Sequence, residues 1–449
     1  MARERDLTTG GITAGLWAFA LPLMLGNVMQ QFYNLVDTWV VGRYIGDSAL
    51  AAVGSSYTLM TFLTSVIIGM CLGSGAYLSM AYGRHDMEDI RGGIFQSFTL
   101  IGALTLVIML IFYLVLDPVI RLLQVPEEIF GDMRTYLFYV FFGFFATFLY
   151  NYFSNVLRSM GNSVIPLLFL GVSVVLNVFL DLYCVWTLHM GIKGAAVATV
   201  IAQTVSGVGI LIYFWTAYPQ LRIRRENMTW NRERLQNILS LSGFTCLQQS
   251  VMNFGILMVQ GIVNSFGAVV MAAFAVAVKI DTIAYMPVQD FGNAFSVFVA
   301  QNFGADKRER IRQGIRSAAL SVLIFCILIS TAVFVLARPL MQIFVDRSGV
   351  EVVNVGVQYL RIEGTFYLGI GILFLLYGYY RAVNKPLMSV VLTVISLGTR
   401  ALLAYLLSGI ESIGVVGIWA AIPIGWFLAD AAGIVYYIKK REKIRIDRQ

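Results

Sequence analysis

The chain has 449 residues, of which 58% are hydrophobic and only 13% are charged, whereas a soluble globular domain is about one-quarter charged. This composition excludes an ordinary cytosolic enzyme. The 32 lysines and arginines outnumber the 25 acids and give a net charge of +7, which in a soluble protein would favour nucleic-acid binding. In a membrane protein the same excess marks the cytoplasmic face, so we expect a lipid bilayer and no nucleic acid as partner.

Apolar runs long enough to cross a bilayer, which needs about 20 residues, recur along the whole chain. They predict an all-α membrane protein with twelve transmembrane helices. The predicted spans are residues 12–41, 50–81, 94–116, 134–157, 163–187, 194–217, 237–264, 270–302, 316–337, 356–380, 387–409 and 415–438.

The basic residues are distributed unevenly between the two sides of this topology. With both termini in the cytoplasm, 23 of the 32 fall on the cytoplasmic side, seven on the outer side and two inside spans. Because loops that stay in the cytoplasm are enriched in Lys and Arg, this distribution supports twelve helices with both ends inside.

The longest polar stretch separates two halves of similar length. We therefore predict two six-helix bundles, an N-lobe at residues 1–220 and a C-lobe at residues 237–449, joined by a cytoplasmic linker at residues 221–236. Six helices per bundle is an even number, so both bundles enter the membrane with the same orientation. Two such lobes around a central cavity are typical of transporters built from parallel repeats.

An ungapped shift of 221 residues pairs the second half with the first and gives nine identities in 49 positions, including Arg91 with Arg312. This supports a duplication. At a shift of 223 residues, Asn177 pairs with Arg400 and Asp181 with Ala404. The second half lacks an acid at the position of Asp181, so we expect any chemistry that depends on this acid to be confined to the N-lobe.

A polar stripe follows one face of the first span. Asn27, Gln30, Asn34 and Asp37 are spaced by three or four residues, which places them on the same side of a helix. Such a stripe must face protein or water rather than lipid. Pro22 lies upstream in the same span, where it favours a bend.

The fifth span carries a second polar face, formed by Ser173, Asn177 and Asp181 at intervals of four residues. Together with Asp37 it offers two carboxylates and an amide oxygen, a hard-oxygen set suited to Na⁺ or to a proton. Two carboxylates in a low-dielectric bundle cannot both stay ionised cheaply, and either cation resolves the conflict. The alternative is a polar network that only holds helices together.

Other charged residues fall inside or near the edge of the later spans, where each is costly and by default a functional hypothesis. Lys279 and Asp281 are two positions apart and do not face each other on a helix. We consider an ion pair of Arg400 with Asp281, in a C-lobe charge network with Lys279. For the remaining acids a structural pair or a misplaced span boundary is the simpler interpretation; these are Asp290, Glu363 and Asp430.

Three stretches resemble signature segments of the multidrug and toxic compound extrusion (MATE) transporters. They are Pro287–Ala305 (PVQDFGNAFSVFVAQNFGA), Leu157–Ser163 (LRSMGNS) and Gly191–Thr199 (GIKGAAVAT), in the family's order. The resemblance extends over essentially the whole chain, including the two six-helix bundles and the long middle loop.

The resemblance implies a cation-coupling site formed by Asp37, Asn177, Asp181 and Thr199, with Na⁺ as one candidate ion, and a helix-bending role for Pro22. Other branches of the family place an acid in the seventh helix. Here that helix carries glutamines and asparagine but no carboxylate, which argues against a C-lobe cation site built on it.

We therefore expect a multidrug efflux antiporter that exchanges H⁺ or Na⁺ for amphipathic, often cationic drugs, without a cofactor. It should act as a monomer in the bacterial cell membrane. A cavity lined by aromatic and Met side chains would suit such substrates. Candidate lining residues from both lobes are Gln30, Tyr33, Asn34, Met258, Tyr285 and Met286.

The sequence leaves two alternatives. A flippase for a lipid-linked oligosaccharide or peptidoglycan precursor, from the same superfamily, would need basic residues in its cavity to hold phosphate, whereas acids outnumber bases within the spans here. A membrane-embedded enzyme would need catalytic or phosphate-binding motifs. None is present, and we expect no catalytic residues.

Overall fold

The computed structural model describes residues 5–123, 125–345 and 349–446, without the side chains of residues 47, 256–257 and 440–446. Three basic residues used for the predicted topology, Arg3, Arg347 and Arg448, lie outside the described residues.

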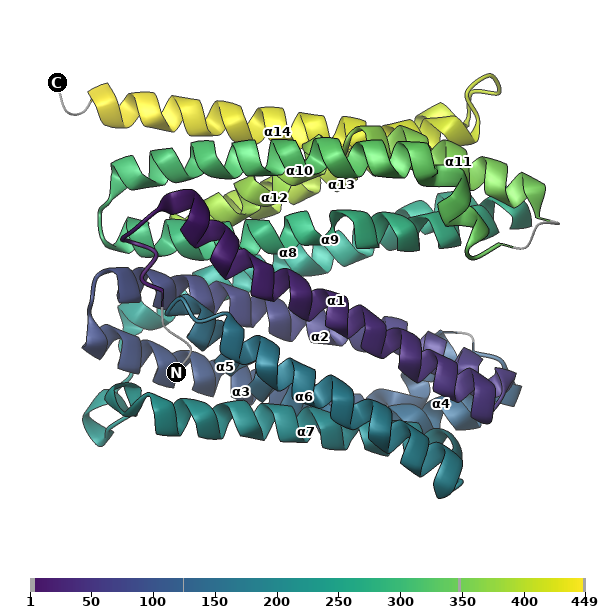
Figure 1. The fold of residues 1–449 in the computed structure, drawn as a ribbon, viewed down its shortest axis with the longest axis horizontal. Coiled ribbons are helices and arrows are strands. Elements are labelled where there is room, and N and C mark those ends of the chain that lie inside the picture. Colours follow the sequence, from purple (N-terminus) through teal and green to yellow (C-terminus); the bar gives the residue numbers. More distant parts are fainter. Residues whose placement is uncertain (1–4, 124, 346–348, 447–449) are drawn as a thin grey trace. The chain divides into compact units, whose positions relative to one another are not determined.

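Within these ranges the chain is almost entirely helical and contains no β-strand (Figure 1). The α-helices are α1 (Ile12–Tyr44), α2 (Asp47–Gly83), α3 (Met87–Leu122), α4 (Glu127–Val140), α5 (Phe144–Ser159), α6 (Val164–Asp181), α7 (Gly191–Ala217), α8 (Arg232–Asn264), α9 (Ala268–Gly304), α10 (Arg308–Gln342), α11 (Val350–Thr365), α12 (Tyr367–Ala382), α13 (Pro386–Ser408) and α14 (Val415–Ile446). Four short helical segments are η1 (Phe141–Gly143), η2 (Leu182–Thr187), η3 (Pro219–Leu221) and η4 (Arg225–Asn227).

The prediction of twelve transmembrane helices is confirmed. In the described part of the chain, eleven helices are long and apolar enough to cross a membrane. A twelfth span is broken, because α11 and α12 meet at an angle of 52°. The fourth span is made of α4, η1 and α5, and the fifth of α6 and η2.

The helices form two compact units, and two of them change unit along their length. The first unit contains residues 5–9 and 18–246, and the second contains residues 10–17 and 247–446. The start of α1 therefore belongs to the second unit, and the start of α8 belongs to the first.

In the first unit, α2 lies at the centre and packs on α3, α4 and α5, while α7 packs on α5 and α6. Glycines permit the closest approach. A Cβ atom at Gly73 would lie 2.4 Å from the carbonyl oxygen of Leu241, and one at Gly69 would lie 2.5 Å from the Cα of Cys246. Because small residues let helix backbones approach each other, this pair fixes the start of α8 against α2.

In the second unit, α9 packs on α10, α11 and α12, and α13 forms a long antiparallel contact with α14. The indole of Trp419 is fully buried and stacks on Phe274 at 5.5 Å between ring centroids. The start of α1 belongs to the same packing, since the indole N–H of Trp17 donates to Ser321 at 3.1 Å.

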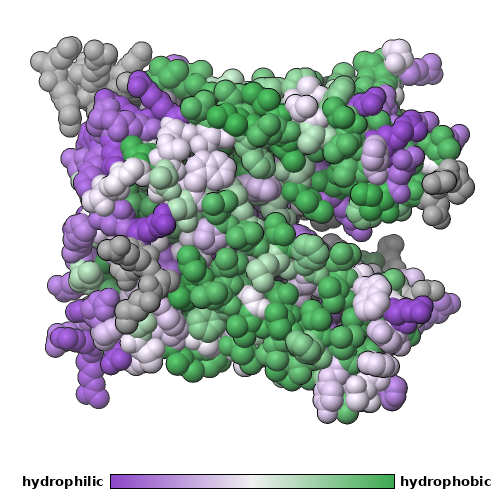
Figure 2. All heavy atoms as spheres, in the orientation of Figure 1, coloured by the Kyte–Doolittle hydropathy of each residue, from purple (hydrophilic) through white to green (hydrophobic). Residues whose placement is uncertain are grey.

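In each unit, hydrophobic side chains cover the middle of the helices, and hydrophilic side chains gather at their ends (Figure 2). The α2–α3 turn and the α7–α8 connection, both predicted to be cytoplasmic, lie together. The Arg234 side chain binds the Asp89 carboxylate at 2.8 Å, and Arg91 donates to the backbone oxygen of Gln220 at 2.8 Å. These contacts anchor the connection between the two halves on the first unit.

Candidate cation-binding site

The four residues expected to form the coupling site come together inside the first unit. Asp37 lies on α1, Asn177 and Asp181 on α6, and Thr199 on α7. All four are buried, with 7%, 1%, 0% and 5% of their surface exposed. The helical spacing that indicated the two polar faces is therefore reproduced in three dimensions, and the faces meet in the interior of the unit.

Hydrogen bonds through Thr199 connect the three helices. The Nδ2 of Asn177 donates to the Thr199 hydroxyl at 3.4 Å, and the hydroxyls of Tyr33 and Thr199 are 3.3 Å apart. Ser173 is not part of this network, because its hydroxyl donates to the backbone oxygen of Ala202 at 3.1 Å.

The carboxyl groups of Asp37 and Asp181 are near enough to influence each other electrostatically. Among the described residues, no N–H or O–H group reaches Oδ1 of Asp37, either carboxylate oxygen of Asp181, or Oδ1 of Asn177. None of the ion pairs in the described chain involves either acid. Buried charge without a partner is strongly unfavourable, so this arrangement is suited to binding positive charge.

These oxygens fit both ions considered from the sequence. One proton between Asp37 and Asp181 would remove the like-charge repulsion. A hard monovalent cation would instead find two carboxylates and the amide oxygen of Asn177, which are its preferred ligand type. Among the described residues, no group of three or more His, Cys, Asp or Glu side chains could hold a metal ion.

The backbone around Asp181 departs from a regular α-helix. α6 ends at Asp181 and continues as the π-helical turn η2, a feature often found at functional sites. α7 packs closely against this turn, because a Cβ atom at Gly194 would lie 3.1 Å from the backbone oxygen of Cys184. The π-turn and the close packing set the position of Asp181 relative to Thr199.

Sequence reasoning missed Tyr136. This buried tyrosine on α4 lies near both Asp37 and Asp181. Nothing in its sequence context distinguished it from the other 21 tyrosines of the chain. Only the packing of α4 against α2 and α7 identifies it as a neighbour of the acid pair.

The six residues expected to line a substrate cavity divide between the two units. Tyr33 and Asn34 are half-buried in the first unit, and Gln30 is exposed. In the second unit Met258 is 48% exposed, and Tyr285 and Met286 are half-buried. A shared cavity stays a prediction.

The second unit contains an acid pair of its own at positions unrelated to Asp37 and Asp181. Asp281 on α9 and Glu363 on α11 are both buried, with their carboxyl groups in contact. No ion pair in the described part of the chain joins Arg400 to Asp281, although Arg400 lies near both acids. Lys279 is exposed and lies on the opposite side of α9 from Asp281.

The fold and the acid pair define a polytopic α-helical protein of the membrane-transporter class. The sequence model of the family described as MatE matches residues 22–183 and 244–406, which is most of the chain. The chain therefore belongs to the MatE family, as its signature segments indicated. The two matched segments begin at residues 22 and 244, and this spacing confirms the internal duplication.

Named relatives match over nearly their whole length. The chain is 29% identical over 437 residues to the "Probable multidrug resistance protein YpnP" of Bacillus subtilis, covering 96% of each chain. It is 28% identical over 442 residues to the "Probable multidrug resistance protein YoeA" of the same organism, covering 96% of this chain and 94% of the other. A solved structure, "MATE in complex with MaL6", shares the fold with a TM-score of 0.92 at 20% identity and 98% coverage of each chain.

Proposed function

We propose that the protein is a multidrug efflux antiporter that exchanges H⁺ or Na⁺ for amphipathic, often cationic compounds. It would act as a monomer in the bacterial plasma membrane with both termini in the cytoplasm. Family membership and the names of the two Bacillus relatives support drug export. The coupling step rests on the site in the first unit.

The observation that carries this proposal is the buried pair of Asp37 and Asp181 with unpartnered oxygens. Such a pair has two states of different charge, one with a bound cation and one without. Antiport requires only that the cation and the drug favour different conformations of the protein. The acid pair supplies the cation-sensitive element.

A structural link from this site to a conformational change is offered by α1. Asp37 lies on this helix, and Pro22 interrupts its hydrogen bonding because proline has no N–H to donate to the carbonyl of Ala18. The same residue, Ala18, is where α1 passes from the second unit to the first. Bending at Pro22 when a cation binds near Asp37 would alter the segment that connects the two units.

The balance of buried charge favours cationic substrates over the phosphate-bearing substrates of a flippase. Among the described residues, the almost fully buried acids are Asp37, Asp181, Asp281, Asp290, Glu363 and Asp430, whereas Arg381 is the one basic side chain buried to that degree. Arg381 is already bound to Ser296 and Asn293. Phosphate would therefore meet mainly negative charge.

Efflux of a fluorescent cationic dye from proteoliposomes tests the proposal. Asp37→Asn and Asp181→Asn remove one negative charge each with little change of shape, and we expect at least about a hundredfold loss of cation-driven efflux, because removing one partner from a buried polar pair typically costs a few kcal/mol. Glu128→Gln, an exposed acid at the start of α4, is the matched control and should retain the wild-type rate.

Wild-type efflux in both aspartate variants would overturn the coupling role of the pair. A wild-type protein that moves a lipid-linked oligosaccharide but no dye would favour the flippase instead.

A further inference from the structure

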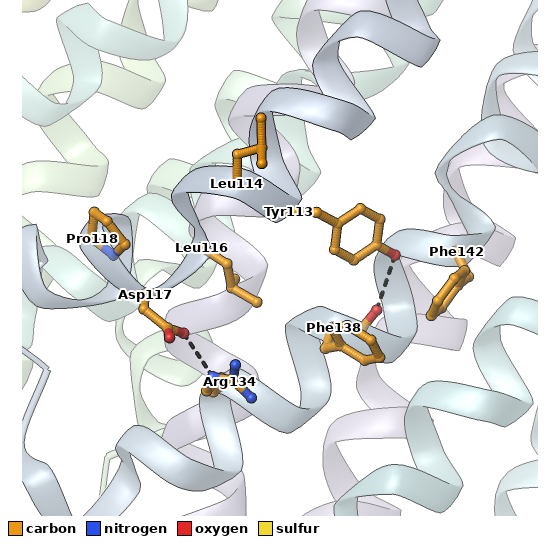
Figure 3. A pocket seen from close by; sticks show the side chains of 8 residues that line it. All are labelled: Tyr113, Leu114, Leu116, Asp117, Pro118, Arg134, Phe138 and Phe142. Atoms are coloured by element: carbon orange, nitrogen blue, oxygen red, sulfur yellow. Dashed lines mark hydrogen bonds and ion pairs between the residues drawn. The ribbon is translucent and has the colours of Figure 1, made fainter.

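A groove of about 340 Å³ lies on the first unit, where the end of α3 meets α4 and η1 (Figure 3). It shares no residue with the candidate cation site, although Tyr136, on the same helix α4, lies near the acid pair. Its wall combines one ion pair with aromatic rings. In the predicted topology this end of the unit faces the outer leaflet of the membrane.

The ion pair forms the charged part of the groove. The Nε of Arg134 donates to Oδ1 of Asp117 at 2.6 Å, and the two side chains remain 51% and 45% exposed. The other N–H groups of Arg134 and the second oxygen of Asp117 are therefore open to a ligand. Asp117 lies five residues before the end of α3, and Arg134 lies seven residues after the start of α4, at the helix ends that the predicted topology places on the outer side.

Aromatic rings form the apolar part. The rings of Tyr113, Phe138 and Phe142 contact one another, with centroids 5.4 to 5.5 Å apart in each pair. The Tyr113 hydroxyl donates to the backbone oxygen of Phe138 at 3.1 Å, which fixes the position of its ring. Figure 3 shows these rings on one side of the groove and the ion pair on the other.

We propose that this groove is a binding site for a zwitterionic phospholipid, specifically phosphatidylethanolamine. The phosphate binds Arg134, whose guanidinium matches phosphate geometry, the ammonium faces Asp117, and an acyl chain lies along Tyr113, Phe138 and Phe142. The pair of opposite charges favours a zwitterionic headgroup over a purely anionic or purely cationic one. An anionic lipid would meet the Asp117 carboxylate, and a purely cationic drug would meet Arg134.

Native mass spectrometry of the full chain in detergent tests the site, with dioleoyl-phosphatidylethanolamine titrated as the probe. We expect Asp117→Asn combined with Arg134→Gln to weaken binding of the first lipid about tenfold, because each of the two half-exposed charges contributes less than one power of ten in affinity. Arg121→Gln removes an exposed arginine one turn further along α3 and should bind as the wild type does.

Equal affinity of the double variant and the wild type would overturn the proposal. Tighter binding of dioleoyl-phosphatidylglycerol or of tetraphenylphosphonium than of phosphatidylethanolamine would also overturn it, because the site would then be anion- or cation-selective. If the double variant fails to fold, Phe142→Ala replaces it. Unchanged lipid affinity of that variant contradicts the assigned role of the rings.

Discussion

Thr199 holds the cation site together through a single hydroxyl. It accepts from Asn177 and lies within hydrogen-bonding distance of Tyr33, so it orients the amide of Asn177 and leaves Oδ1 of that amide free. Asp37 and Asp181 then face each other without a basic neighbour. The properties of the site depend on how a few polar atoms are oriented, and Thr199 can be altered without changing the charge of the site.

Thr199→Val should weaken cation coupling, because valine keeps the shape of threonine but cannot form either hydrogen bond. Loss of two hydrogen bonds of about 1 kcal/mol each should raise the cation concentration for half-maximal efflux by roughly ten- to thirtyfold. Thr199→Ser keeps the hydroxyl and should stay within about threefold of the wild type. Efflux rates measured against imposed cation concentration compare the two, and identical shifts would show that the hydroxyl is not required.

The proximity of the residues in the candidate cation site could largely be predicted from the sequence, because Asp37 on one helix and Asn177 and Asp181 on another follow helical spacing within apolar segments. Tyr136 and Glu363 could not. Tyr136 reaches the acids only through the packing of α4, and Glu363 contacts Asp281 from a helix 82 positions away in sequence. Helical periodicity indicates which residues share a face, and it carries no information on which faces meet.

At the scale of the helix, α1 and α8 are the elements that connect the two units. Residues 12–17 of α1 belong to the second unit and the rest of that helix to the first. Residues 232–246 of α8 belong to the first unit and the rest of that helix to the second. The sequence predicted a single boundary between the two units, in the polar linker. It did not predict that α1 and α8 each contribute to both units, because the predicted span of each helix is one continuous apolar run. The bend between α11 and α12 was also unpredicted, because the predicted span at residues 356–380 contains no Pro and was taken as one continuous helix.

Pro22→Ala should raise the stability of the protein and lower its transport activity. Alanine is about 3 kcal/mol more favourable than proline inside a helix, so α1 should become stiffer and the apparent melting temperature should rise, while cation-driven efflux falls. Pro166→Ala is the control, because Pro166 lies in the first turn of α6, where no N–H is needed. If Pro22→Ala transports at the wild-type rate, bending of α1 at this residue is not part of the cycle.

The close packing of α8 on α2 predicts a substitution that lowers stability, whereas Pro22→Ala should raise it. Gly73→Ala would place a methyl group 2.4 Å from backbone atoms of α8, and overpacking of this kind typically costs 1–3 kcal/mol. Gly54→Ala, on the same helix with nothing within 4 Å, should leave stability unchanged or increase it, since alanine favours helices. Thermal unfolding in detergent measures both, and equal melting temperatures would contradict the close approach.

The connection between the two halves should be held in place by Asp89, which binds both Arg84 and Arg234. Asp89→Asn weakens both ion pairs, and trypsin should then cleave the arginine-rich segment at residues 222–234 several times faster. Asp306→Asn breaks an ion pair with Arg308 that is exposed on both sides, and such pairs contribute little. Its cleavage rate should match that of the wild type; a faster rate in both variants would point to a nonspecific effect.

At the scale of the whole molecule, the sequence predicted the number of spans from its apolar runs and the duplication from the residues that match between the two halves. In the described part of the chain the twelve apolar runs correspond to eleven candidate spans and one bent helix pair, and the two halves match one family model separately. The duplication does not extend to the chemistry. Asp37 and Asp181 in the first unit correspond to no acid at the equivalent positions of the second, which instead pairs Asp281 with Glu363.

Efflux from proteoliposomes with separately imposed pH and Na⁺ gradients tests the coupling most directly. We predict that one of the two gradients, directed against the drug flux, drives efflux in the wild type, and that the same gradient drives none in Asp37→Asn or Asp181→Asn. Efflux that proceeds at the same rate with neither gradient, or that requires ATP, would contradict coupling at the buried acid pair.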